Sequence, residues 1–75
     1  METQQQTGAT NVEYDLYSEI HSLLKGNAAL ERYIQDAKRE GDQEMESCFD
    51  LIRNQNKQYV EKLREMIAKR LAKAA

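Results

Sequence analysis

The chain lacks most of the features that stabilise very small proteins. Its 75 residues include one cysteine, one histidine, no proline and no tryptophan. A single cysteine excludes an intrachain disulfide, and a lone histidine leaves no Cys and His cluster to hold a structural metal. So short a chain also buries proportionally little of its surface. Oligomerisation is the remaining way to complete its core.

The sequence also lacks long apolar runs and enzyme motifs. No stretch approaches the roughly 20 apolar residues that span a bilayer. Residues 1–10 have neither the basic nor the apolar part of a signal peptide. No nucleophile lies next to a plausible base, and no glycine-rich phosphate loop is present. We therefore expect a cytoplasmic protein with no membrane association, no catalytic activity and no cofactor.

Helix-forming residues are abundant on both sides of one turn signal. Lys38 and Arg39 suit the carbonyl end of a helix, and Gly41 suits the left-handed position that follows it. Asp42 can accept hydrogen bonds from the first amides of a second helix. The sequence predicts a disordered tail over residues 1–10, a helix over 11–40 that starts after a candidate cap at Thr10 or Asn11, a turn at 41–42 and a helix over 43–72.

Both predicted helices carry apolar residues at alternating spacings of four and three, which is typical of helices packed against each other. So short a link favours antiparallel neighbours. The predicted hairpin interface contains Leu16, Ile20, Leu23, Asn27, Leu30, Ile34 and Ala37 in the first helix and Met45, Phe49, Ile52, Asn56, Tyr59, Leu63 and Met66 in the second.

Two asparagines interrupt these apolar series, and counting outward from the turn places them in one layer. An unpaired buried amide costs roughly 1–3 kcal/mol, so Asn27 and Asn56 should bond each other or a trapped water. Such a polar layer fixes register and oligomer state. A small polar ligand site in the same layer is the alternative. Gly26, beside Asn27, is expected to allow close approach by another helix.

The apolar surface is wider than two helices need, so a second hairpin should cover the remainder. The fold class predicted is all-α: an antiparallel two-helix hairpin that dimerises into a four-helix bundle. We expect the thiol of Cys48 to be buried and inert. The residues expected at the oligomer interface are Tyr17, Leu24, Val60 and Ile67 far from the turn, and Tyr33 and Cys48 on the other side near the turn.

The net charge of −2 is unevenly divided, because residues 1–50 carry −7 and residues 51–75 carry +5. Folding at the turn would bring the acidic start of the first helix beside the basic end of the second. We interpret the asymmetry as complementarity within the hairpin. The residues concerned are Glu13, Asp15 and Glu19 on one side and Lys69, Arg70 and Lys73 on the other.

The region from Leu23 to Ile67 resembles one helical hairpin of the rubrerythrin and ferritin-like proteins. Ala37, Gly41 and Phe49 match the helix end, the turn and the first core aromatic of that pattern. The chain is also similar to short, uncharacterised bacterial helical proteins. The resemblance implies a helical hairpin fold.

The same resemblance implies a site without its metal ligands. In ferritin-like di-iron proteins each hairpin supplies a glutamate and a Glu-x-x-His motif. Those three positions are occupied here by Leu23, Asn56 and Tyr59. The sequence thus predicts a non-catalytic oligomerisation or protein-interaction module, most simply a homodimer. Two alternatives stay open: ferritin-like metal or cofactor binding at a dimer interface, and nucleic-acid binding through the basic end of the second helix.

Overall fold

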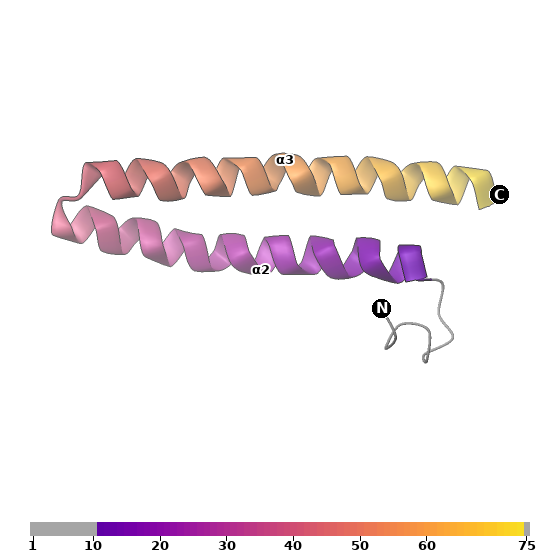
Figure 1. Ribbon diagram of the computed structural model, residues 1–75, viewed down its shortest axis with the longest axis horizontal. Helices are drawn as coiled ribbons and strands as arrows, with labels where there is room; N and C mark the ends of the chain where they lie inside the picture. Colours follow the sequence, from indigo (N-terminus) through magenta and orange to yellow (C-terminus); the bar gives the residue numbers. More distant parts are fainter. Residues whose placement is uncertain (1–10, 75) are drawn as a thin grey trace.

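The computed structural model describes residues 11–74 and places them in two antiparallel helices, α2 (Asn11–Glu40) and α3 (Gln43–Ala74) (Figure 1). The helices pack against each other along their length, which confirms the predicted all-helical hairpin. α3 continues past the expected end at Ala72. The predicted tail and Thr10 lie outside the described residues. Neither helix is long and apolar enough to cross a bilayer.

The chain leaves α2 through a left-handed glycine. Gly41 has a φ of 72°. Its amide donates to the carbonyl of Lys38 at 3.0 Å, and the amide of Asp42 donates to the carbonyl of Ala37 at 3.0 Å. This pair of bonds is the Schellman arrangement, which satisfies carbonyls that have no partner inside the helix. Lys38 and Arg39 add favourable positive charge in the same turn.

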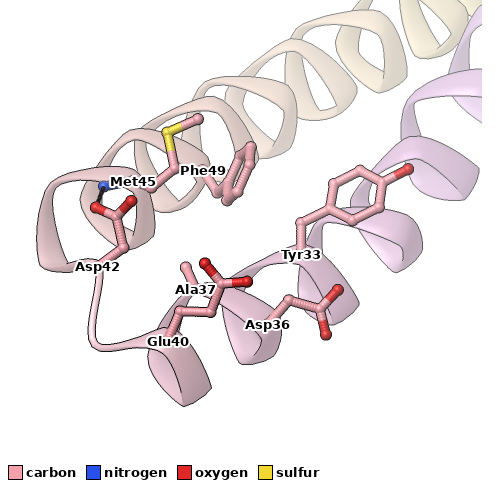
Figure 2. Close-up of a pocket in the computed structure, with 7 residues that line it drawn as sticks. All are labelled: Tyr33, Asp36, Ala37, Glu40, Asp42, Met45 and Phe49. Atoms are coloured by element: carbon pink, nitrogen blue, oxygen red, sulfur yellow. Dashed lines mark hydrogen bonds between the residues drawn. The ribbon is translucent and has the colours of Figure 1, made fainter.

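Asp42 ends one helix and begins the other. Its carboxylate Oδ1 accepts from the amide of Met45 at 3.0 Å (Figure 2). Its carbonyl accepts from the amide of Glu46 at 3.0 Å. The side chain is therefore the N-cap of α3. Lys38 and Glu46 lie 4.0 Å apart across the link. Because the link has only two residues, α3 cannot move away from α2 and runs back alongside it.

The core is small and lies mainly on the turn side of α2. Among the described residues, four apolar side chains are buried: Leu30, Ile34, Ala37 and Val60. Apart from Val60, inward-facing positions farther from the turn are only half-buried. On α3 the inward positions are Phe49, Arg53, Asn56, Val60, Leu63, Ile67 and Arg70.

The rotation of α3 about its axis differs from the prediction. Tyr59 is 54% exposed and Ile52 is 42% exposed, although both were expected in the hairpin interface. Met45 and Met66 are exposed as well. Val60, expected beside this interface, is only 6% exposed. The prediction that Ile52, Tyr59 and Met66 lie in the hairpin interface is therefore wrong, whereas Asn27 and Asn56 do share a layer.

The reason is that α3 carries two overlapping heptad series, both containing Phe49, Asn56 and Leu63. One series continues three residues after each of these, and the other continues four residues after each. The prediction used the first series, which has Ile52 where the second has Arg53. The structure uses the second, since an arginine can pack its aliphatic stem between helices while its guanidinium reaches carboxylates. The first series adds Ile52, Tyr59 and Met66; the second adds Arg53, Val60 and Ile67.

Gly26 is not explained within the hairpin. A Cβ built at this position meets nothing within 4 Å. The close approach expected from the sequence therefore does not occur between α2 and α3.

Replacement of Gly41 tests the turn. Gly41→Ala should lower the free energy of unfolding by about 1–2 kcal/mol, because a left-handed conformation costs an L residue this much. Gly41→Asn is the matched control and should lose less, since asparagine tolerates that conformation. Urea unfolding followed by circular dichroism measures both. Equal stability of Gly41→Ala and wild type would show that the turn has another conformation in solution.

Candidate functional site

The asparagine layer predicted from the sequence is present. Asn56 donates from Nδ2 to Oδ1 of Asn27 at 3.0 Å, and Asn27 donates from Nδ2 to the carbonyl of Arg53 at 3.2 Å. Both asparagines are half-buried. Each bond joins α2 to α3, so the layer fixes which turn of one helix faces which turn of the other. Asn56 thus satisfies the amide oxygen of Asn27, and the amide nitrogen of Asn27 bonds to the backbone of α3.

Arg53 is the main polar residue that the sequence analysis missed. Its guanidinium donates to Glu31 of α2 and, from Nη2, to Oδ1 of Asp50 of α3 at 2.6 Å. The arginine side chain is 23% exposed, much less than either carboxylate partner. Its hydrogen bond to Glu31 raises the pKa of Arg53, against the lowering effect of desolvation, and the charges of Glu31 and Asp50 add to the rise. Arg53 therefore stays charged and links the two helices.

A polar hollow of about 290 Å³ surrounds this arginine on one face of the hairpin. Its three carboxylates and two cationic groups come from both helices and largely offset one another, which leaves a net charge of −1. No three His, Cys, Asp or Glu side chains within residues 11–74 are grouped to hold a metal ion. The lining residues are Glu31, Ile34, Gln35, Lys38, Glu46, Ser47, Asp50 and Arg53.

The same face becomes apolar toward the open end of the hairpin. Tyr17 and Leu24 are exposed there and border a groove of about 500 Å³. Val60 and Ile67 form part of its wall but belong to the hairpin interface, Val60 as a core residue. Both residues were predicted to lie at the oligomer interface, but in the hairpin they offer little surface for a second copy to contact. Ile20, Arg64, Ala68 and Leu71 complete the lining.

The opposite flank carries the other predicted interface residues. The rings of Tyr33 and Phe49 lie 5.7 Å apart between their centroids, across the two helices. Beside them is a hollow of about 240 Å³ next to the turn (Figure 2). Cys48 is an exposed free thiol, so its expected burial does not occur in the hairpin. The hairpin leaves this flank uncovered. The hollow is lined by Tyr33, Asp36, Ala37, Glu40, Asp42, Met45 and Phe49.

At the open end, Glu13 and Arg70 line the same small hollow between the helix ends. Two ion pairs that join α2 to α3 lie nearer the turn, Lys38 with Glu46 and Arg53 with Glu31. The basic residues at the end of α3 remain on an exposed surface apart from Arg70, which is half-buried.

No protein-family model matches this chain, and comparisons with curated proteins and with solved structures find no match. The resemblance to rubrerythrin and ferritin-like hairpins therefore stays a prediction. Of the positions that would hold metal ligands in that family, Leu23 and Asn56 are half-buried between the helices and Tyr59 is exposed.

A double-mutant cycle tests the asparagine layer. Asn27→Leu or Asn56→Leu alone leaves one amide without its partner, whereas the double replacement removes both amides and adds apolar area. The double variant should therefore melt above the wild type, and the coupling between the two sites should be roughly 0.5 kcal/mol or more. Thermal and urea unfolding of the four proteins measure it. Strictly additive effects, or a lower melting temperature of the double variant, would contradict the pairing.

Arg53 and Arg39 form a matched pair for testing the link between helices. Arg53→Lys should lower the melting temperature, because a lysine has no planar fork with which to contact Glu31 and Asp50 together. Arg39→Lys should change little, since within residues 11–74 Arg39 pairs with Asp36 of its own helix at an exposed site. Equal effects of the two changes would mean that the Arg53 network adds nothing to helix pairing.

Proposed function

We propose that this protein is a non-catalytic self-association module, a helical hairpin that pairs with a second copy of itself to form a four-helix bundle and acts through protein contacts. The observation that carries the proposal is the imbalance between buried and exposed apolar residues. Within residues 11–74, four apolar side chains are buried, whereas eleven large apolar residues are exposed. The hydrophobic effect favours covering such an exposed apolar surface.

Two helices alone have no means to bury these residues. Each helix of a pair offers its neighbour one narrow face, and a side chain about a quarter-turn away from that face stays in contact with water. In a four-helix bundle each helix has two neighbours, so a wider apolar arc is buried. The exposed tyrosines suit the edges of such an interface, where the ring is covered and the hydroxyl stays wet.

A homodimer is the simplest assembly that meets this need. An isologous contact uses one surface twice, and two copies close the assembly without further partners. The proposal takes the protein to be cytoplasmic. Its single cysteine, Cys48, is a free thiol, which suits a reducing compartment.

Light scattering tests the proposal directly. The measured mass at micromolar concentration should be twice the 8.7 kDa of one chain. The melting temperature should rise with protein concentration, because a dimer that dissociates on unfolding is stabilised by mass action. A folded monomer whose melting temperature does not depend on concentration would overturn the proposal.

A further inference from the structure

One exposed apolar surface runs along most of α3. Met45, Ile52, Tyr59 and Met66 are spaced seven residues apart, so they lie on one side of the helix. All four are exposed. We call this set the apolar stripe. Asn56 and Leu63 face α2. Tyr59 and Met66 follow these two residues by three positions and lie to one side of them. Val60 and Ile67 follow them by four positions and lie to the other side. The stripe and the groove near Tyr17 thus lie on opposite flanks of the hairpin interface.

The two flanks differ in how far their apolar surface extends. The flank with the groove is apolar only toward the open end, because the polar hollow around Arg53 occupies its other half. The stripe begins in the first turn of α3 and ends near its last turns. A second hairpin is as long as the first, so a full-length apolar surface suits it best.

The α2 surface on the stripe side is much less apolar. Met45 of the stripe and Tyr33 of α2 border the same hollow, which places Tyr33 on this side. At intervals of seven, this side of α2 carries Val12, Glu19, Gly26, Tyr33 and Glu40. If α3 packed on α2 of a partner, the stripe would meet two glutamates and a glycine, and only Val12 and Tyr33 would be apolar. Only the stripe of a second α3 offers apolar residues along its full length.

We propose that the second copy binds through the apolar stripe with the opposite direction, so that α3 packs antiparallel on the partner's α3 and the turn of each hairpin lies beside the open end of the other. This inference rests on the proposed function and specifies its surface. When two hairpins stack face to face by twofold symmetry, like helices lie over each other only if the hairpins run in opposite directions. In a turn-to-turn dimer, both turns lie at the same end, and α3 would instead stack on the partner's α2.

The spacing of the stripe sets the register of this contact. Its four residues are symmetric about a point between Gln55 and Asn56. Ile52 then lies opposite the partner's Tyr59, and Met45 lies opposite the partner's Met66. The hollow beside Met45 has an apolar floor of Ala37, Phe49 and Met45, and its volume of about 240 Å³ accepts the partner's Met66.

The same register explains why small residues lie in the middle of α2. Asn27 is bonded to Asn56, so the symmetry point on α2 also falls near Asn27. Gly26 then lies next to the partner's Ala29, where small side chains let two helices approach closely. The open space around a Cβ at Gly26 is space that the partner helix would occupy.

Charge favours the antiparallel direction. The half of the hairpin nearer the turn, residues 28–55, has seven acidic and four basic residues and a net charge of −3. The other half, residues 11–27 and 56–74, has five acidic and seven basic residues and a net charge of +2. Antiparallel pairing places each acidic half on a basic half. Turn-to-turn pairing would place like charge beside like charge.

Individual side chains agree with this balance. Lys69 follows Met66 by three residues and so lies on the stripe side of α3. In the proposed register it lies opposite the partner's Asp42, on the acidic rim of the hollow. Asp36, which would approach the partner's Glu19, is already paired with Arg39 of its own chain.

Cross-linking tests the direction, and the native cysteine supplies the control. Cys48 and Gln55 are seven residues apart and lie along one line beside the stripe. In the proposed dimer, the two copies of residue 55 are offset by only one residue along the axis, whereas the two copies of Cys48 are separated by about 22 Å at 1.5 Å per residue. A short bismaleimide should therefore cross-link Cys48→Ser/Gln55→Cys efficiently and leave the wild type uncross-linked.

The outcomes separate this inference from the proposed function. Light scattering of reduced Cys48→Ser/Gln55→Cys reports whether it dimerises. A dimer that does not cross-link at residue 55, or a wild type that cross-links at Cys48, would overturn the antiparallel contact while the self-association module stands. A monomer would overturn both.

Two tyrosines of similar exposure test the surface. Tyr59 is 54% exposed and belongs to the stripe, whereas Tyr17 is 57% exposed and lies on the other flank. Tyr59→Ser should raise the dimer Kd roughly tenfold or more, as loss of a buried aromatic at an interface does. Tyr17→Ser should leave the Kd unchanged. The reverse result would assign the interface to the groove. Sedimentation equilibrium measures both values.

Discussion

The structure depends on a geometric constraint: two helices share only one narrow strip of surface. α3 has an apolar arc wider than that strip, so turning one edge of the arc toward α2 turns the other edge away. In this chain Val60 is buried and Tyr59 next to it is exposed. The core, the exposed stripe and the proposed dimer all follow from that one choice of rotation. The hairpin is therefore well defined in register while leaving a large part of its apolar surface uncovered.

The two edges of α3 differ in their polar residues. Either edge of α3 satisfies the alternation of four and three, and the edge with Ile52 and Tyr59 is the more apolar. Arg53 lies on the other edge, where it reaches Glu31 and Asp50 at once. The asparagine layer belongs to both series and leaves the choice open. The structure turns the edge with this ionic link toward α2 and leaves the more apolar edge exposed.

The sequence was sufficient for the parts that depend on local chemistry. Gly41 and Asp42 identify the link, and counting from them pairs Asn27 with Asn56, because both inferences use spacing along the chain. The rotation of α3 was missed, since a heptad pattern gives the period of an apolar surface and not which edge of it is buried. The position of Arg53 depends on a carboxylate 22 residues away in the chain, which no local pattern records. The exposure of Cys48 was missed for the same reason: it depends on what packs over its flank.

The link described at Asp42 controls more than the direction of the chain. The last hydrogen bonds of α2 and the first hydrogen bonds of α3 meet at this one residue. The start of α3 is therefore fixed both in its rotation about the helix axis and in its position along α2. Each residue in an α-helix turns the chain by about 100°. A link of different length would therefore rotate α3 about its axis. A different edge of α3 would then face α2, and a different edge would face solvent. In that sense the length of a two-residue turn selects the surface that the protein presents to its surroundings.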